Sequence, residues 1–385
     1  MIHLFVNFLA ASAGGGLTYV RNVIPQFARR TDLRVTAALS PDARRELAAA
    51  SNIEFLELEL PSVARFWYEQ RVLPELTRKS GANVLLSAGN FALRYSPVPQ
   101  ILLSRNSLYL SRDFFRDLRS RREYRMLLAT RMRALLAKRS VHWADVTVAP
   151  SQAFATELER WTGAKIVALH HGFDKDTFAR DCSPLPEQAQ LRLDAVADCL
   201  KILFVSHYNY YRNFETLIHA LPLLRHRLAG RKACLLLTCH LAPGLNPGTY
   251  KPDYAKQLIR DLAVSEMVVE LGPIPYHQLH HVYAQADIYA TAAYAETFAH
   301  PLVEAMATGV PVVASDIPVH REICGDGALY FERFSPEALV ESILQITSEN
   351  KVRRSIVERG TTRAGQFSWK VHVDQIIELS RLLLE

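Results

Sequence analysis

The sequence lacks any run of about 18 apolar residues, which argues against a helix that spans a membrane. It also lacks low-complexity tracts, and its 16 glycines and 19 prolines among 385 residues are ordinary amounts. Collagen-like and disordered classes are therefore excluded. With 49% hydrophobic and 22% charged residues, the composition predicts a globular protein, and the length favours two or three domains.

Cysteine is scarce, with five residues at Cys182, Cys199, Cys234, Cys239 and Cys324. Their number is odd, they are scattered, and no C-x-x-C pair occurs, so we expect reduced thiols in a cytosolic protein. Cys234 and Cys239 lie in the apolar run C-L-L-L-T-C, which favours buried packing over chemistry.

The apolar stretch from Ile2 to Ala13 imitates a signal peptide because it ends in Ala11-Ser12-Ala13. It has no Lys or Arg before the apolar residues, however, and it leads directly into a glycine turn. We therefore expect a first buried strand here.

Short apolar runs alternate with longer amphipathic segments along the chain, which predicts parallel sheets covered on both faces. The first set of expected strands is 2–8, 33–38, 84–87, 101–104, 146–149 and 166–170, with helices such as 18–29 and 151–161. After a break that follows Phe178, strands are expected at 201–206, 234–238, 268–271, 288–290, 312–314 and 329–331, before a final helix at 371–384. Two doubly wound units would place a cleft between them, with ligands at the carboxyl ends of strands.

A glycine motif, Ala13-Gly14-Gly15-Gly16-Leu17-Thr18, lies between the first strand and the first helix. Glycines permit close approach of a ligand, and the helix that follows offers free N–H groups to an anion. The motif is neither G-x-G-x-x-G nor a P-loop with its Lys, which argues against nicotinamide and ATP. The alternative is a plain tight turn.

A second motif, Y-A-E-T-F-A-H-P-L-V-E-A-M-A-T-G-V-P, covers residues 294–311. Pro301 suits the first turn of a helix and Gly309 its end. Glu296 is then expected in the loop before the helix, and Glu304 about one turn inside it. Two carboxylates and free N–H groups suit a ligand with hydroxyls and phosphate. The alternative is an ordinary helix with surface glutamates.

This segment resembles the E-x7-E pattern of family 4 retaining glycosyltransferases. The matching residues are Glu296, Phe298, Pro301, Glu304, Ala305, Met306, Ala307, Gly309, Pro311, Val312 and Val313, while Thr297 and Ala299 stand where the family has glycine. The resemblance continues through 312–331, with Asp316 and Glu322, and includes Leu271–Ile274, His171–Asp174 and the triple glycine.

The resemblance implies an α/β protein with two facing Rossmann-like domains, the GT-B fold. The implied divisions are an N-terminal acceptor domain at 1–180, a linker at 181–198, a C-terminal nucleotide-sugar domain at 199–365, and a helix at 366–385 that returns to the first domain. The family transfers sugar from a nucleotide donor with retention, and the implied enzyme needs neither a cofactor nor a metal.

The resemblance also implies roles for individual residues, which we assign by their positions in the family's motifs. Glu304 would bind ribose hydroxyls, and Glu296 would face the donor sugar. Gly15 and Gly16 would belong to the loop of the first domain that contacts the donor. The N–H groups of Phe298, Ala299 and His300 would bind sugar hydroxyls and phosphate, and the backbone of Ile274 would hold the base.

The diphosphate site departs from the family pattern. Arg212 replaces the usual Lys, and its planar guanidinium suits phosphate oxygens. His207 stands where an Arg is expected, or is an ordinary loop histidine. Arg105 and Asn106 stand where many members have a His near the reacting carbon, and either could take that positioning role or be a polar pair at a strand end.

Two further clusters have rival interpretations. His277, His280 and His281 have helical spacing, but no carboxylate or cysteine completes a metal site, so a solvated helix face is expected. Residues 112–139 hold ten basic and three acidic side chains, a net +7 against +6 for the whole chain. This segment suits an anionic membrane surface or an acidic acceptor, the alternative being a solvated helix face, and nothing in it resembles a nucleic-acid recognition module.

The function that this resemblance implies is that of a metal-independent retaining hexosyltransferase, which we expect in the cytoplasm, peripheral at the inner face of the membrane. Its acceptor would be a hydroxyl of a glycan or lipid-linked glycan in cell-envelope polysaccharide synthesis. The alternatives are a nucleotide-sugar epimerase on the same fold, which would release a free epimer without an acceptor, and a non-catalytic nucleotide-sugar or glycan-binding protein.

Overall fold

The computed structural model describes residues 1–11, 14–60, 62–228 and 230–385. Ser12 and Ala13, which belong to the signal-like pattern and to the glycine motif, lie outside them. The described chain divides into two compact units: residues 1–172 with 367–385, and residues 173–366. The segment 181–198, expected as a linker, includes a helix at Glu187–Asp194 and lies within the second unit.

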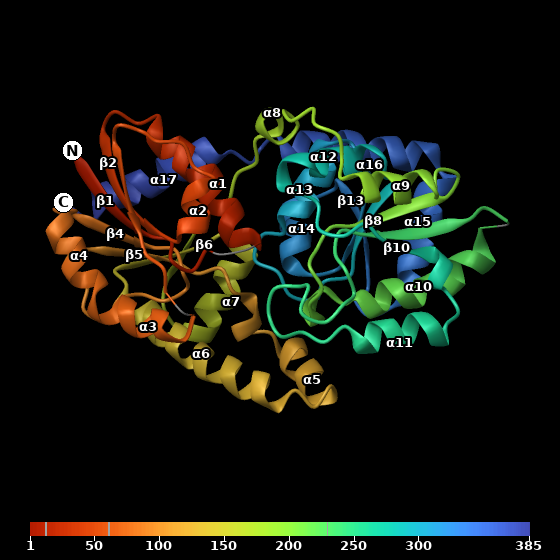
Figure 1. The fold of residues 1–385 in the computed structure, drawn as a ribbon, viewed down its shortest axis with the longest axis horizontal. Coiled ribbons are helices and arrows are strands. Elements are labelled where there is room, and N and C mark those ends of the chain that lie inside the picture. The colour runs from red at the N-terminus through yellow and green to blue at the C-terminus, as the bar shows by residue number, and fades with distance from the viewer. Residues whose placement is uncertain (12–13, 61, 229) are drawn as a thin grey trace. The chain divides into compact units, whose positions relative to one another are not determined.

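In the first unit, seven described strands form a parallel sheet in the order β3-β2-β1-β4-β5-β6-β7 (Figure 1). Their bounds are β1 Ile2–Asn7, β2 Leu33–Leu39, β3 Ile53–Glu57, β4 Val84–Ser87, β5 Gln100–Leu103, β6 Val146–Ala149 and β7 Ile166–Ala168. All six residues of β1 are buried, as expected for a first core strand. The helices are α1 Gly14–Ala28, α2 Pro41–Arg45, α3 Ser62–Arg71, α4 Leu73–Ser80, α5 Arg112–Ser120, α6 Tyr124–Trp143, α7 Gln152–Thr162 and α17 Trp369–Leu382, with a short 3-10 turn η1 at Ser107–Tyr109.

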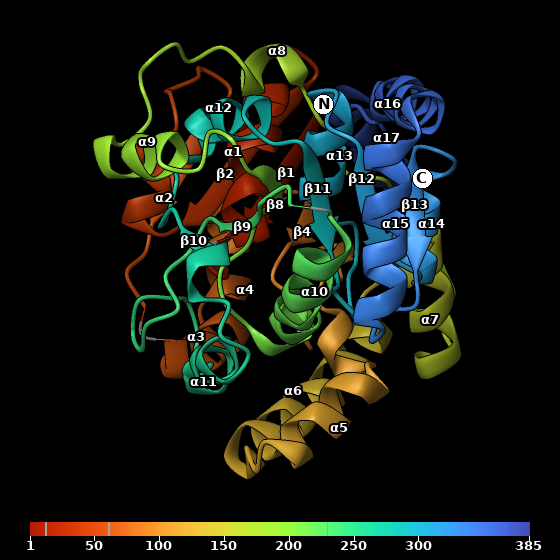
Figure 2. The ribbon, with the colours of Figure 1, turned by 90° about the vertical axis from the view of Figure 1, so that its right-hand side faces the viewer.

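In the second unit, six described strands form a parallel sheet in the order β10-β9-β8-β11-β12-β13. Their bounds are β8 Leu200–Phe204, β9 Ala233–Leu237, β10 Val268–Glu270, β11 Ile288–Thr291, β12 Val312–Ser315 and β13 Ala328–Phe331. The α-helices are α8 Lys175–Phe178, α9 Glu187–Asp194, α10 Phe214–Arg227, α11 Asp253–Asp261, α12 Leu279–Ala284, α13 His300–Ala307, α14 Pro318–Cys324, α15 Pro336–Ser348 and α16 Asn350–Ala364. The 3-10 turns are η2 Tyr210–Arg212, η3 Ser265–Met267 and η4 Tyr276–Gln278. Helix α10 packs against α15, and in the first unit α5 packs against α6 (Figure 2).

The expected fold of two Rossmann-like parallel-sheet units is confirmed. Most strands of the two sheets are buried on both faces, which is why they are continuous apolar runs in the sequence. Cys234 and Cys239 are buried as predicted, and burial raises the pKa of each thiol to about 12.

Helix α17 completes the first unit, so the expected return of the last helix is also confirmed. Its residues Trp369, Val373, Ile376 and Ile377 join the core beneath β1 and α1. A Cβ at Gly172 would lie 1.9 Å from the backbone nitrogen of Trp369, so this close approach requires glycine.

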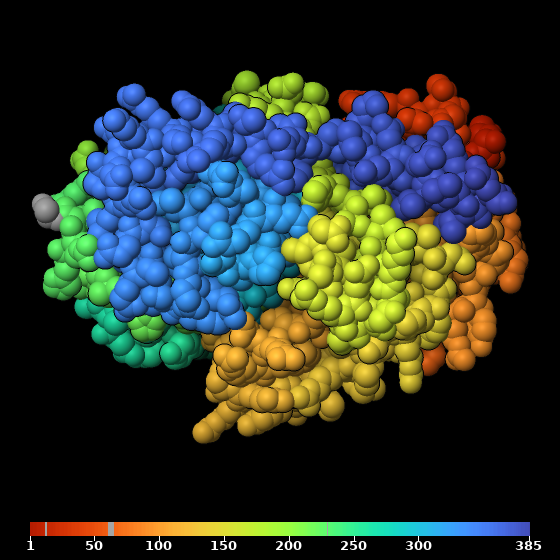
Figure 3. Space-filling view, turned by 180° about the vertical axis from the view of Figure 1, so that it is seen from behind, coloured from red at the N-terminus to blue at the C-terminus, as the bar shows by residue number. Residues whose placement is uncertain are grey.

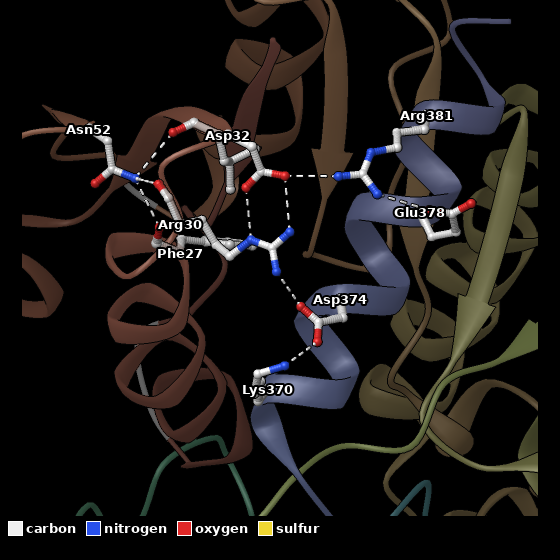
Figure 4. A network of polar contacts seen from close by, with 9 residues as sticks. Phe27, Arg30, Asp32, Asn52, Lys370, Asp374, Glu378 and Arg381 are labelled. Atoms are coloured by element: carbon white, nitrogen blue, oxygen red, sulfur yellow. Dashed lines mark hydrogen bonds and ion pairs between the residues drawn. The ribbon is translucent and has the colours of Figure 1, made fainter.

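Charged side chains hold the outer side of α17 (Figure 4). Arg30 donates to Asp374 at 2.7 Å and to Asp32 at 2.9 Å, and Arg381 donates to the same Asp32 carboxylate at 2.8 Å. These contacts link α17 to the turn between α1 and β2.

Candidate donor site at the carboxyl edge of the second sheet

The strand order of the second sheet reverses between β8 and β11. These two strands are neighbours in the sheet, although β9 and β10 lie between them in sequence. In an open parallel sheet, ligands bind outside the carboxyl ends of the strands at such a reversal. The loops that follow β8 and β11 carry His207, Arg212, Glu296 and the start of α13. A backbone hydrogen bond of 3.0 Å from Tyr294 to Tyr211 joins these two loops. The topology thus brings together the residues that the sequence predicts for the donor.

Helix α13 begins at His300, with Pro301 in its first turn, and Gly309 follows its end with a φ of 77°. Glu296 therefore lies in the preceding loop and Glu304 one turn inside the helix, as predicted. Phe298 is 1% exposed, and its ring centroid lies 4.9 Å from that of His300. The helix N-terminus has the positive dipole end that suits an anion.

Glu304 is a buried carboxylate held by Tyr283 of α12. The Tyr283 hydroxyl lies 2.9 Å from Oε2 of Glu304 and also 3.2 Å from the carbonyl oxygen of Pro301. Burial raises the pKa of Glu304 to about 7, and the hydrogen bond from Tyr283 opposes part of that rise. The group can therefore change charge near neutral pH, and ligand hydroxyls that donate to it would favour its ionised form.

Arg212 and Glu296 form an ion pair in which Glu296 is 9% exposed and Arg212 18%. The Nε of Arg212 is buried and has no hydrogen-bond partner among the described residues. A guanidinium with an unused donor beside a helix N-terminus is suited to a phosphate oxygen.

Asn213, which the sequence analysis did not select, fixes the turn that carries Arg212. Its φ of 54° places it in the left-handed region. Its side-chain amide donates to the carbonyl oxygens of Ala292 at 3.1 Å and Arg333 at 2.7 Å, and its Oδ1 accepts from Thr216. An Asn directly after a candidate site Arg is a weak signal in a sequence, but Asn tolerates this backbone conformation better than most residues.

Two histidines lie near Arg212. Partial burial and then the charge of Arg212 lower the pKa of His207, so its ring is neutral at pH 7. Burial lowers the pKa of His320 to about 4. Nδ1 of His320 lies 2.9 Å from the carbonyl oxygen of Ser315 and so carries the proton, which leaves Nε2 as an acceptor without a partner among the described residues. Sequence analysis missed His320, because nothing in its motif distinguishes it from a core residue.

Ala299 has a φ of 65°, in the left-handed region. The family pattern places glycine there. Alanine at this position strains the backbone directly before α13, because its Cβ disfavours the left-handed conformation.

Ile274 is half-buried in the loop after β10. Gly272 precedes it with a φ of 81°, and a Cβ at Gly272 would lie 2.7 Å from Nε2 of His240.

Among the described residues, no group of three or more His, Cys, Asp or Glu side chains could hold a metal ion. His277 lies 3.3 Å from Asp181, and the ring centroids of His280 and His281 lie 3.9 Å apart with the rings tilted by 38°.

The predicted residues of the first unit also gather at a strand-order reversal, between β1 and β4. Gly15 and Gly16 are in the first turn of α1. Arg105 donates to the carbonyl oxygens of Gly15 at 3.3 Å and Ala88 at 2.7 Å, and its guanidinium lies 4.9 Å from the Tyr19 ring centroid. Burial lowers the pKa of Arg105.

Asn106 is placed differently from Arg105. Its Oδ1 accepts from the backbone N–H of Leu108 at 3.0 Å and caps η1. Of the pair, Arg105 contacts the glycine loop directly, and Asn106 fixes the turn that follows.

Residues 193–363 match the family described as "Glycosyl transferases group 1". The match covers most of the second unit and no residue of the first. The matched segment contains Arg212, Glu296, Glu304 and α13, so the donor-site geometry above lies within the part of the chain that carries the family match.

Other proteins are similar to this chain over longer stretches. Over 253 residues, the chain is 28% identical to the D-inositol 3-phosphate glycosyltransferase of Corynebacterium aurimucosum, covering 64% of this chain and 59% of that relative's length. The fold matches sucrose-phosphate synthase from Thermosynechococcus elongatus (TM-score 0.79, 18% identity, 100% and 99% of the two chains) and Anabaena HepE in complex with UDP-glucose (TM-score 0.74, 17% identity, 98% and 99%).

Proposed function

We propose that the chain is a retaining glycosyltransferase that moves a hexose from a nucleotide-diphosphate sugar to a hydroxyl of a glycan or lipid-linked glycan. The observation that carries this proposal is the Arg212–Glu296 pair beside the N-terminus of α13, with Glu304 one turn inside that helix. The match of residues 193–363 to the glycosyl transferase family and the UDP-glucose bound by a protein of the same fold support a nucleotide-sugar donor.

In this proposal Glu304 accepts hydrogen bonds from the ribose hydroxyls, and Ile274 holds the base through its backbone. The donor diphosphate meets Arg212, His207 and the N–H groups at Phe298–His300. Phosphate oxygens would compete with Glu296 for Arg212, which would release the Glu296 carboxylate to accept from the sugar hydroxyls. The ion pair is thus a resting arrangement that the donor replaces.

The transfer step follows from leaving-group chemistry. The bond between C1 of the sugar and the diphosphate oxygen breaks, and the acceptor hydroxyl oxygen bonds to C1 on the same face. Its proton passes to the departing diphosphate. Arg212 and the α13 N-terminus stabilise the negative charge that develops, which is the main contribution of a protein to such a step. No metal and no cofactor takes part in the proposed reaction.

With such an acceptor, the proposed enzyme acts in cell-envelope polysaccharide synthesis and is peripheral at the inner face of the cytoplasmic membrane. None of the described helices combines the length and the apolar character needed to cross a bilayer. Arg105 and the glycine loop of the first unit remain the residues proposed to assist the donor and the reacting carbon, with Asn106 beside them.

The test begins with a thermal-shift panel of nucleotide diphosphates and nucleotide sugars. A ligand at 100 times its dissociation constant stabilises the folded state by about 2.7 kcal/mol. The stabilising donor is then incubated with the purified protein, and products are followed by NMR. Slow hydrolysis or transfer that keeps the anomeric configuration supports the proposal. Release of a free epimer would indicate an epimerase, and binding without turnover a non-catalytic protein.

A further inference from the structure

Helix α6 (Tyr124–Trp143) has two apolar stripes on different sides. The inner stripe is buried in the first unit and consists of Leu127, Thr130, Ala134, Ala137 and Val141, which recur every three or four residues. Ala134 and Ala137 pack in one cluster with Tyr109 of η1. This stripe accounts for the attachment of α6 to its unit, as expected for an amphipathic helix.

The outer stripe consists of Tyr124, Leu128, Met132 and Leu135, which are 62%, 63%, 57% and 59% exposed. Their spacing of four, four and three residues puts them on one line, nearly opposite the inner stripe at about 100° per residue. Single exposed apolar residues are common, whereas a contiguous exposed row of large ones marks an interaction site.

The charged side chains within α6 have one sign. The 20 residues of α6 include no Asp or Glu, and Arg125, Arg131, Arg133 and Arg139 are exposed. On the adjacent α5, two carboxylates already face arginines, with Asp113 3.4 Å from Arg116 and Asp117 2.6 Å from Arg121. Figure 3 shows α5 and α6, coloured orange to yellow, on the surface of the first unit. The helix therefore presents an apolar row flanked by arginines, with Glu123 at its N-cap as the acid nearest to the row in sequence. Such a row complements a lipid surface, whose interior is apolar and whose head groups are anionic.

We propose that this outer face of α6 docks on an anionic lipid bilayer. Tyr124, Leu128, Met132 and Leu135 enter the boundary between head groups and acyl chains, and Arg125, Arg131 and Arg139 contact lipid phosphates. This inference rests on one part of the proposed function, the peripheral location at a membrane, and identifies the surface responsible for it. It does not depend on sugar transfer. A second copy of the chain is a poorer occupant, because a symmetric contact would place arginines against arginines.

The first experiment is sedimentation with vesicles of phosphatidylcholine alone or mixed with phosphatidylglycerol. The wild-type protein is expected to sediment with the mixed vesicles and to remain in solution with the neutral ones. Changing Arg125, Arg131 and Arg139 together to Gln should lower the partition coefficient about a hundredfold. Added salt should weaken binding of the wild-type protein, since the Debye length falls from about 10 Å at 0.1 M to about 3 Å at 1 M.

Matched controls separate this face from surface charge in general. Lys351, Arg354 and Arg359 of α16 changed together to Gln remove the same charge from the second unit and should leave sedimentation unchanged. Leu128→Ser with Met132→Ser should lower partition at least about tenfold, whereas Leu191→Ser with Leu245→Ser, exposed in the second unit, should not. Donor hydrolysis by all four variants should equal that of the wild type, so a failure of the enzyme proposal is distinguishable from a failure of docking.

A tryptophan reporter tests entry into the bilayer directly. Leu128→Trp should show a blue-shifted emission with anionic vesicles, quenched by brominated acyl chains, and Leu245→Trp should show neither. Equal sedimentation with both lipids, sedimentation with neither, or an unquenched Leu128→Trp would overturn the proposal. So would a wild-type dimer that the two serine substitutions in α6 convert to monomer, since that outcome assigns the stripe to a second copy.

Discussion

Glu304 has a pKa of about 7 in the unliganded chain, so nucleotide-sugar binding should depend on pH. In the proposed donor complex, ribose hydroxyls would donate to the ionised carboxylate and lower its pKa, which would release a proton. Affinity should therefore rise with pH up to about 7 and then level off. Calorimetry in buffers of different ionisation enthalpy measures the proton directly.

Glu304→Gln is the control for this linkage and should remove the proton release along with part of the affinity. Hydrogen bonds to charged groups contribute about 1.5–3 kcal/mol each. Protonation of His207 would produce the opposite slope, with affinity falling as pH rises. A falling or flat profile for the wild type would contradict the ribose role of Glu304.

Ala299 offers a stabilising substitution. Its φ of 65° costs a non-glycine residue about 1–2 kcal/mol, and glycine costs about 0.5–1 kcal/mol more entropy on folding. Ala299→Gly should therefore raise the free energy of unfolding by about 0.5–1 kcal/mol in urea titrations. Ala129→Gly, in the interior of α6, should lower it by a similar amount. Equal effects of the two changes would show that backbone strain at Ala299 is negligible.

At the scale of elements, the turn η2 depends on the Asn213 side chain for its position. Asn213→Ala removes two hydrogen bonds to carbonyl groups and leaves alanine in a left-handed conformation. We expect a loss of about 2–4 kcal/mol in the free energy of unfolding. Asn213→Gly keeps the backbone conformation and should lose less.

Both Asn213 variants should also lower turnover of the donor at temperatures where they are folded, because Arg212 is the preceding residue. Their turnover should not fall below that of Arg212→Ala, for which we expect a loss on the order of 10²-fold in rate. If Asn213→Gly matched the wild type in stability and turnover, the amide would not fix this turn.

The sequence predicted most elements of both sheets because buried parallel strands are continuous apolar runs. The exception among the strands is β3 (Ile53–Glu57), an edge strand that contains two glutamates and is only partly buried. Helix α13 was predicted with its loop because Pro301 and Gly309 mark its ends. Contacts made by single side chains over long sequence distances, such as Asn213 to Arg333, leave no periodic pattern.

The same limit applies within the donor site. Glu296, Glu304 and Arg212 were selected from a motif and a resemblance, whereas Tyr283 and His320 become visible as neighbours only in three dimensions. Their residue types suit a core as well as a site, so sequence alone could not separate the two.

At the scale of the whole molecule, the first unit depends on residues distant in sequence. Ile376 of α17 is fully buried in the core with β1 and α1. Ile376→Ala should lower the free energy of unfolding of this unit by about 2–5 kcal/mol, because it leaves a cavity. Hydrogen exchange should accelerate in β1, α1 and β2 and stay unchanged in β8–β13.

Arg381→Gln is the matched surface change on α17. Its ion pair with Asp32 joins side chains that are 47% and 41% exposed, so the loss should stay below about 1 kcal/mol. Equal acceleration of exchange in both units after Ile376→Ala would contradict the assignment of α17 to the first unit alone.

Because α17 belongs to the first unit, the order of translation also affects the order in which the two units can fold. A ribosome makes residues 1–172, then the whole of 173–366, and only afterwards the residues 367–385 that fill the first core. The second sheet can therefore fold while the first still exposes the groove meant for Trp369, Val373 and Ile376. The first unit is therefore synthesised first but completes its folding last. Its incomplete core is the part of the nascent chain that would need a chaperone.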